Sequence, residues 1–155
     1  GAEDLIVRCK SITIPEVTID EMSTQFMGTE QFFPGKKHTG GDVTATFYET
    51  EDQQIERIFY EWHQKIFNMD PDNDLLAGGS SGAVKRAITS EIIVQGFKYN
   101  KVPMPYSFKL YNCWPKNVSN PTFDFSSNEG NTINVTFKCD YWKLVLAGSN
   151  RDYTI

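Results

Sequence analysis

A chain of 155 residues has the size of one domain, and its 39% hydrophobic and 14% aromatic residues are enough to form a core. The formal net charge of -5 argues against a protein that grips nucleic acid, because such proteins concentrate lysine and arginine against the phosphates. No apolar run is long enough to span a membrane, and no secretory signal pattern is present. We therefore expect a single domain over residues 1–155 with no membrane anchor.

Three cysteines, Cys9, Cys113 and Cys139, form an odd set without C-x-x-C spacing. This pattern fits neither a disulfide framework nor a zinc site. We expect buried free thiols, and the sequence leaves an intersubunit disulfide open.

The first predicted elements are two strands. Residues 5–14 are rich in aliphatic and β-branched side chains and end at Pro15, which cannot donate to a sheet ladder. Residues 16–20 alternate, with Thr18 and Asp20 on the polar face.

Residues 26–42 are rich in glycine and contain a proline, which predicts a long loop. This segment also carries Phe26, Met27, Phe32 and Phe33. These apolar side chains either fold back onto their own domain or insert against a neighbouring subunit.

A strand over residues 43–49 is followed by a predicted helix, in which Thr50 and Gln53 supply the two ends of a capping box. The helix is expected to end before Pro71. Its apolar stripe, expected to pack on a sheet, consists of Ile55, Ile58, Phe59, Trp62 and Ile66.

The next segment is a predicted flexible loop, in which Asp70, Asp72 and Asp74 imitate the start of a calcium loop. The EF-hand pattern requires glycine and glutamate at positions held by Leu75 and Ser81. We therefore expect no metal site and no cofactor.

Residues 87–99 and 104–111 read as a hairpin of two strands, each with one polar side. Ile88, Ile92 and Val94 are expected to share the apolar face. The polar faces hold Thr89, Glu91 and Gln95 on the first strand, and Ser107 and Lys109 on the second.

The last predicted strands are residues 122–125 and 132–146. Many strands and one helix predict a mainly β fold, a barrel or sandwich with the helix packed on its outer side.

Several short motifs occur along the chain in a recognisable order. In the first half they are RCKS at 8–11 before Ile14 and Pro15, the Phe26-Met27 segment, and Gly41-Asp42. In the second half they are WPKNV at 114–118, FDFSSN at 123–128, VTF at 135–137 and DYW at 140–142. In order and approximate spacing over residues 5–142, this set resembles one known family, the tail tube proteins of contractile-tailed bacteriophages, within the Hcp-like tube superfamily.

The chain also departs from this family. The family usually begins with a further segment and strand ahead of Leu5, so either the N-terminal segment is missing here or the sheet closes differently. Residues 143–155 form a C-terminal tail that the resemblance does not place. Gly28, Thr29 and Glu30 stand where the family tends to have more basic residues.

The resemblance implies a virion structural protein that forms hexameric rings, stacked into the inner tube of a contractile tail and assembled in the cytoplasm of the bacterial host. It implies strands that join neighbouring subunits into one inner barrel, with a ring interface at Phe26, Met27, Phe32 and Phe33. It also implies partners: the tail sheath protein, the tape measure protein, and baseplate and tail terminator proteins. The residues expected toward the lumen are Thr18, Asp20, Thr89, Glu91, Gln95, Ser107 and Lys109.

From the negative net charge we expect a channel wall that repels phosphates, so that genomic DNA passes during ejection without specific binding. We expect no enzyme, because neither His38 nor His63 lies in a motif with a nucleophile and an orienting acid.

Two alternatives remain at the level of sequence. One is the tube of a type VI secretion system or a tailocin, which shares the fold and carries a different cargo. The other is a monomeric β-sandwich that binds a ligand in an aromatic groove. A protein that stays monomeric at high concentration would favour the second alternative.

Overall fold

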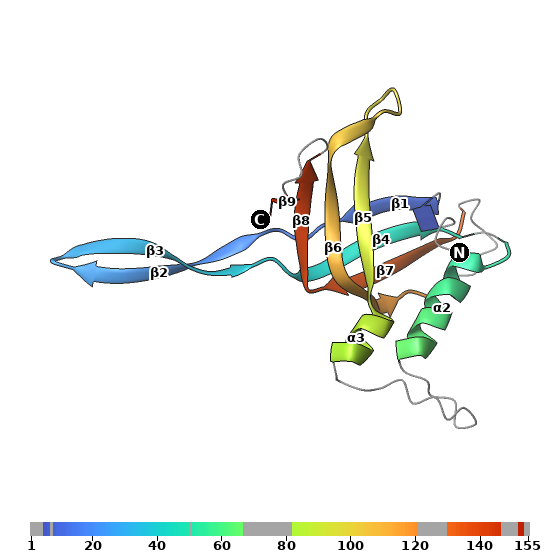
Figure 1. Cartoon of the computed structure of the whole chain (residues 1–155), viewed down its shortest axis with the longest axis horizontal. Helices are drawn as coiled ribbons and strands as arrows, with labels where there is room; N and C mark the ends of the chain where they lie inside the picture. The colour runs from blue at the N-terminus through green and yellow to red at the C-terminus, as the bar shows by residue number, and fades with distance from the viewer. Residues whose placement is uncertain are drawn as a thin grey trace.

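The computed structural model describes residues 5–6, 8–49, 51–66, 82–120, 130–146 and 152–153. Figure 1 shows a mainly β body with one main helix, as predicted, and a long hairpin that projects from it. The predicted strand 122–125, Thr50 of the capping box and the three aspartates near residue 70 lie outside the described residues.

A curled antiparallel sheet forms the body, with β6 in its middle. The sheet order is β1–β4–β7–β6–β8–β9, and β5 pairs with the other side of β6. Its strands are β1 (Cys9–Thr13), β4 (Gly41–Tyr48), β5 (Ser90–Phe97), β6 (Pro103–Val118), β7 (Thr132–Cys139), β8 (Tyr141–Leu146) and β9 (Asp152–Tyr153). The first part of β6 pairs with β5 and β8, and its last part pairs with β7.

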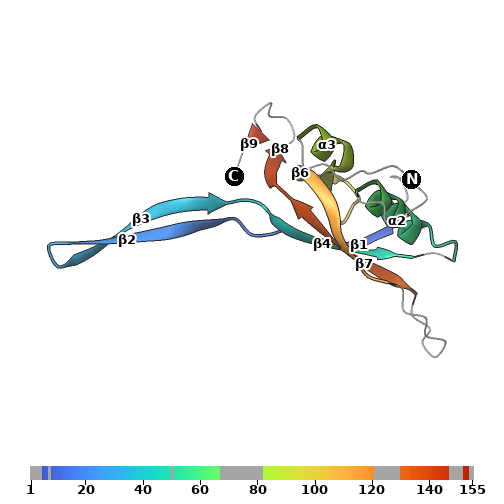
Figure 2. The ribbon, with the colours of Figure 1, turned by 90° about the horizontal axis from the view of Figure 1, so that it is seen from below.

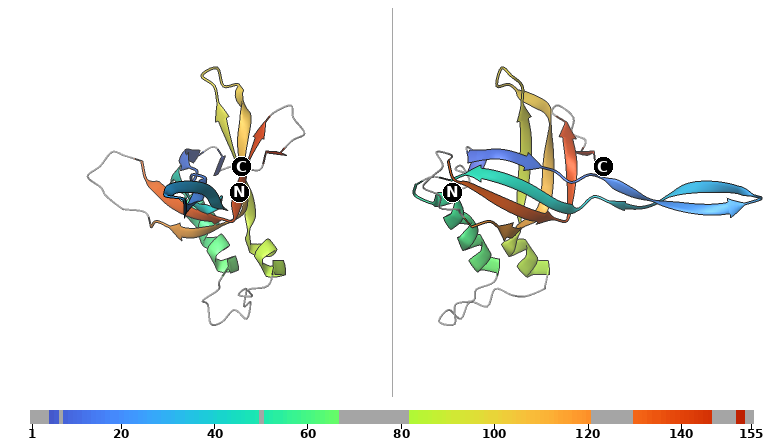
Figure 3. Two further views of the ribbon diagram at one scale, coloured as in Figure 1. Left: turned by 90° about the vertical axis from the view of Figure 1, so that its left-hand side faces the viewer. Right: turned by 180° about the vertical axis from the view of Figure 1, so that it is seen from behind.

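The sheet bends where β7 passes into β8. Tyr111 pairs with Tyr141, and Trp114 pairs with Lys138, so the register with β6 stays constant across the bend. Between these pairs, Asn112 has a φ of 54°, a left-handed conformation that asparagine tolerates better than most residues. The predicted continuous strand 132–146 is thus two strands separated at Asp140, and part of the predicted tail, residues 143–146, belongs to β8. In Figure 3, β5, β6 and β8 cross the direction of β1, β4 and β7.

The core lies between this sheet and α2 (Gln54–Ile66). Alternate residues of β4 and β7 are buried, and Phe59 of α2 has no exposed surface. The Phe59 ring centroid lies 5.6 Å from that of Phe47 and 5.7 Å from that of Phe137. The predicted helical stripe and its packing on the sheet are confirmed.

The predicted capping box is wrong. Arg57 donates its backbone N–H to the carbonyl of Gln53, so Gln53 precedes the helix and does not hold the third helical position. Instead, the carboxylate of Glu49 accepts the backbone N–H groups of Ile55 and Glu56 at 3.2 and 2.9 Å. A side chain at the end of β4 therefore caps α2, which fixes the turn between them.

A second helix, α3 (Gly82–Ile88), occupies the start of the predicted strand 87–99. Ile88 belongs to this helix and does not share the face of Ile92 and Val94 in β5. Trp62 of α2 donates its indole N–H to the Ile88 carbonyl at 2.7 Å, which joins the two helices.

The predicted loop over residues 26–42 is also wrong, because this segment is mostly strand. β2 (Thr18–Phe26) and β3 (Thr29–His38) form a separate two-stranded sheet. Met27 and Gly28 join them with φ values of 50° and 77°, as a two-residue type I′ turn requires. Methionine is rare at the first of these positions, so the turn signal was hidden in the sequence.

The first predicted strand is shorter than expected, because residues 5–6 and 8 are helical and β1 begins at Cys9. Cys9 is exposed on this edge strand, which corrects the expectation that all three thiols are buried. Cys113 and Cys139 are buried, as expected.

Candidate functional site

The β2–β3 hairpin stands away from the body and exposes nearly all of its side chains. Every residue of β2 is exposed, as is every residue of β3 except Gly35. Strands of this length reach about 30 Å at the usual rise per residue. Figure 2 shows the hairpin extending beyond the curled sheet.

One face of the hairpin is the more apolar. Met22 pairs with Phe33, and Phe26 pairs with Thr29 four residues nearer the tip on the same face. Met22, Phe26 and Phe33 are 57%, 63% and 50% exposed. Phe32 pairs with Ser23 and lies on the opposite face. The four predicted interface residues are therefore all at the distal part of the hairpin, but they do not form one surface.

Two strands alone form a sheet that is marginal in water, because one layer buries little apolar surface. Large apolar side chains exposed together usually mark an interaction site. The hairpin therefore has the form of an arm that gains stability by packing on another surface.

The second candidate surface is the polar side of β5, β6 and β8. The register pairs Ile93 with Lys109 and Gln95 with Ser107, so these side chains share a face with Glu91. The opposite side holds Ile92, Val94, Phe108 and Leu110, which pack into or against the core. Lys109 Nζ lies 3.9 Å from Glu91 Oε1. The predicted division of these two strands into an apolar and a polar face is therefore confirmed for β5 from Glu91 onward and for the part of β6 that includes Ser107 and Lys109.

Sequence reasoning missed the contribution of β8 to this polar face. Lys143 pairs with Lys109, and Tyr141 pairs with Tyr111. The Tyr111 and Tyr141 rings stack at 4.7 Å, and Lys143 Nζ lies 5.7 Å from the centroid of Tyr111. Counting in steps of two from Tyr141 along the predicted strand would have placed Lys143 on this face.

The outer edge of β5 has no strand beside it among the residues that the structure describes. An open strand edge presents unpaired N–H and C=O groups, and it is a template for pairing with another chain. β5 thus contributes residues to the polar face and also provides the open edge of the sheet.

Three of the predicted lumen residues lie elsewhere. Thr18 and Asp20 are at the base of the hairpin, where Thr18 pairs with His38 and Asp20 Oδ2 lies 2.9 Å from His38 Nε2. Thr89 lies between α3 and β5, and its hydroxyl donates to the Lys85 carbonyl at 2.8 Å. The structure therefore brings together Glu91, Gln95, Ser107 and Lys109 but separates them from the other three.

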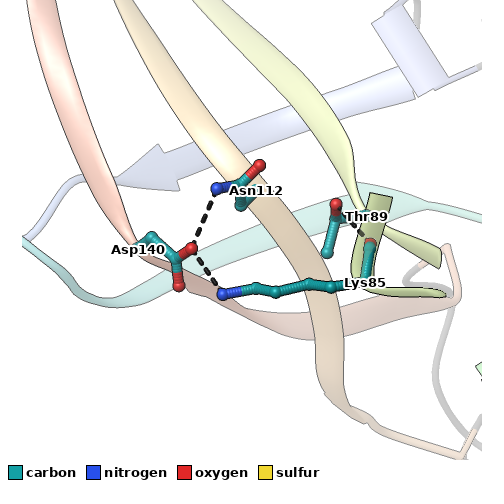
Figure 4. A network of polar contacts seen from close by, with 4 residues as sticks. All are labelled: Lys85, Thr89, Asn112 and Asp140. Atoms are coloured by element: carbon teal, nitrogen blue, oxygen red, sulfur yellow. Dashed lines mark hydrogen bonds and ion pairs between the residues drawn. The ribbon is translucent and has the colours of Figure 1, made fainter. Parts of the chain in front are cut away.

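A polar cluster holds the bend of the sheet together (Figure 4). Asp140 Oδ2 accepts hydrogen bonds from Lys85 Nζ at 2.5 Å and from Asn112 Nδ2 at 2.9 Å. The hydrogen bond from Lys85, and then that from Asn112, lowers the pKa of Asp140 below its ordinary value, although partial desolvation opposes the shift. Through this carboxylate, α3 is attached to the point where β7 becomes β8.

We expect Asp140→Asn to destabilise the protein only where Asp140 is ionised. A lowered pKa in the folded state stabilises the protein above the ordinary carboxyl pKa of about 4, and this contribution is lost as the pH falls through the lowered value. The side chains of Lys85 and Asp140 are 47% and 39% exposed, which limits the expected loss to about 1 kcal/mol. Urea denaturation at a series of pH values from 7 downward measures the free energy of unfolding. The difference in this free energy between the variant and wild type should become smaller as the pH falls. Asp52→Asn, in an exposed turn, is the control, and a gap that persists at acid pH would contradict the assignment.

Other kinds of site receive little support. His63 Nε2 lies 2.9 Å from the Pro115 carbonyl, to which its N–H donates, and His38 faces Asp20. Within the described part of the chain, no three metal-binding side chains cluster. The helices described there are too short or too polar to cross a membrane.

The model of one family, phage tail tube protein, matches residues 1–145. The chain belongs to this family. Two similar relatives are the tail tube proteins gp19 of Enterobacteria phages T4 and T6, each 22% identical over 142 residues that cover 91% of this chain and 82% of the relative.

Solved structures with the same fold come from contractile injection systems. The cap of the anti-feeding prophage tube has a TM-score of 0.64 at 17% identity, covering 90% of this chain and 80% of that one. The sheath-tube complex of the extracellular contractile injection system PVC, in its extended state, has a TM-score of 0.63 at 13% identity, with 90% and 81% covered.

Proposed function

We propose that this tail tube family member is the structural subunit of the inner tube of a contractile phage tail, where hexameric rings stack into a conduit. The observation that carries the proposal is the β2–β3 hairpin, an arm of exposed strands with an apolar face, which pairs with no further strand in the described part of the chain. Packing of this arm on a subunit of the next ring would bury Met22, Phe26 and Phe33. The same contact would stabilise a sheet that is marginal alone.

Closure of each ring uses the open edge of β5. Pairing of this edge with a strand of the adjacent subunit joins the polar faces of all subunits into one inner barrel and leaves no free edge. Glu91, Gln95, Ser107 and Lys109 then face the lumen, joined by Lys143. Thr18 and Asp20 reach the lumen only if the base of the hairpin continues this wall, and Thr89 only if the end of α3 does.

The proposed channel wall is only weakly charged, which revises the negative wall expected from net charge. On the described polar face, the negative Glu91 lies beside the positive Lys109, and Lys143 adds a second positive charge. This face therefore carries one excess positive charge per subunit, which Asp20 would offset only if the base of the hairpin continues the wall. With one ion pair and one further lysine per subunit, such a wall offers few cations to the phosphates, so genomic DNA passes without being held.

The partners follow from the position of the tube. An inner tube of a contractile tail contacts the sheath outside, the tape measure protein inside, and the baseplate and tail terminator at its ends. The subunit assembles in the host cytoplasm and remains in the virion tail. The similarity of gp19 of phages T4 and T6 over nearly the whole chain favours a phage tail over a secretion device, and the family gives the chain a structural role.

Electron microscopy of the concentrated full-length protein tests the proposal. We expect rings or tubes with sixfold symmetry and an open channel, in equilibrium with subunits on dilution. Double-stranded DNA added to the tubes at low salt should not be retained. A protein that remains monomeric at high concentration would support a self-contained binding module instead, and retention of DNA would reject a wall that does not hold phosphates.

A further inference from the structure

β6 and β7 bring two thiols together inside the sheet. Cys113 Sγ and Cys139 Sγ lie 2.7 Å apart, although the residues are 26 positions apart in the chain. Both are buried, with exposed fractions of 0% and 3%. Neither cysteine lies on the proposed assembly surfaces. Two buried thiols in direct contact are also a different arrangement from a single thiol that fills space in a core.

The strand register places these two residues directly opposite each other. The pairs Trp114 with Lys138 and Tyr111 with Tyr141 lie on either side, and the register between them is constant. Directly opposed residues of antiparallel strands have Cβ atoms about 4.5–5.5 Å apart. A disulfide needs a Cβ separation of about 3.5–4.5 Å. A small adjustment of the pair therefore permits a bond without moving either strand to a new register.

The two thiols differ in access and in acidity. Cys139 lines an open depression together with His38, Gly40 and Lys138, whereas Cys113 is fully buried. The hydrogen bond from Cys113 lowers the pKa of the Cys139 thiol, and the same bond, with burial, raises the pKa of Cys113. Cys139 is thus the thiol that ionises first, and its residue lies nearer the surface than Cys113 does.

We propose that Cys113 and Cys139 are a peroxide-responsive pair that closes to a disulfide between β6 and β7 within one subunit. The Cys139 thiolate attacks one oxygen of hydrogen peroxide, so that an S–O bond forms, the O–O bond breaks, and the hydroxide that leaves becomes water by taking up the thiol proton. The Cys113 sulfur then attacks the sulfenic sulfur of Cys139. An S–S bond forms, the S–O bond breaks, and the second oxygen leaves as water with the proton of Cys113. Two thiols are oxidised, and one peroxide is reduced to water.

The bond would lock the bend of the sheet. Asn112 and Asp140 are the neighbours of the two cysteines at the point where β7 becomes β8. A crosslink here joins the core side of the sheet to the part that carries the polar face. It also restricts the unfolded chain, which raises the melting temperature.

Treatment of the full-length protein with hydrogen peroxide, followed by denaturation, thiol alkylation and intact-mass measurement, tests this inference. The three cysteines should take up three alkyl groups before oxidation and one after it. A peptide map should link Cys113 to Cys139, and the melting temperature should rise and return on reduction. The matched control is Cys9→Ser, which changes the exposed thiol and should fall from two alkyl groups to none.

A second variant traps the intermediate. Cys113→Ala leaves the Cys139 sulfenic acid without its partner, so dimedone should label Cys139 in this variant and not in the oxidised wild type. Disulfides formed through Cys9 between subunits, or over-oxidation of Cys139 without a link to Cys113, would overturn the proposal. The peptide map of the wild type decides the question even if Cys113→Ala fails to fold.

Discussion

Phe33→Ser should raise the concentration needed for tube assembly by about 30-fold, the equivalent of about 2 kcal/mol for an aromatic anchor at an interface. Phe33 lies beside Met22 on the apolar face of the hairpin and is half exposed in the subunit. It belongs to no core contact, so the unfolding midpoint should change little. Sedimentation across a dilution series measures assembly, and urea denaturation of the dilute subunit measures folding.

Phe32→Ser is a closely matched control for this experiment. It removes the same kind of side chain at the preceding position, from the opposite face of the hairpin, where Phe32 is 59% exposed against 50% for Phe33. We expect a clearly smaller effect on assembly. Equal losses for both variants would show that both faces are covered in the tube. Unchanged assembly in both would remove the hairpin from the proposed function.

Phe59→Ala should reduce the free energy of unfolding by about 3–5 kcal/mol. Phe59 has no exposed surface and packs its ring against Phe47, Trp62 and Phe137, which lie on α2 and on two neighbouring strands. Removing it leaves a cavity that rigid strands cannot fill. Because a domain of this size is stable by only about 5–15 kcal/mol, much of the subunit would unfold at moderate temperature.

Urea denaturation followed by circular dichroism measures this loss. Tyr60→Ala, one residue further along α2, is the control, because Tyr60 is 63% exposed and touches no core ring among the described contacts. Its stability should stay within about 0.5 kcal/mol of wild type. A loss below about 1 kcal/mol for Phe59→Ala would mean that α2 does not anchor the core.

Sequence reasoning was most successful where one face of a helix or strand is buried. The alternation of Val43, Ala45 and Phe47 and the helical stripe around Phe59 both record burial against a core, so period and packing agree. The polar face of Glu91 and Lys109 was found for the same reason, because Ile92 and Leu110 mark its buried side. Sequence reasoning found only the start of the hairpin, in the predicted strand 16–20, and missed the rest, because these strands have no buried side within the subunit and their alternation is weak.

The candidate sites depend on pairings that a linear pattern does not contain. Phe32 and Phe33 are adjacent in sequence, yet their strand places them on opposite faces, and only the register with Met22 shows which face is apolar. The separation of Thr18 and Asp20 from Glu91 likewise follows from the hairpin leaving the body.

The sequence by itself determined the mainly β fold class, the amphipathic helix and the family to which the chain belongs, because burial and motif spacing are local properties of the chain. The tertiary structure alone decided the projecting arm, the bend at Asp140 and the meeting of Cys113 with Cys139. Each of these comes from pairing between segments distant in the chain, where hydrogen-bond register and not local preference sets the neighbours.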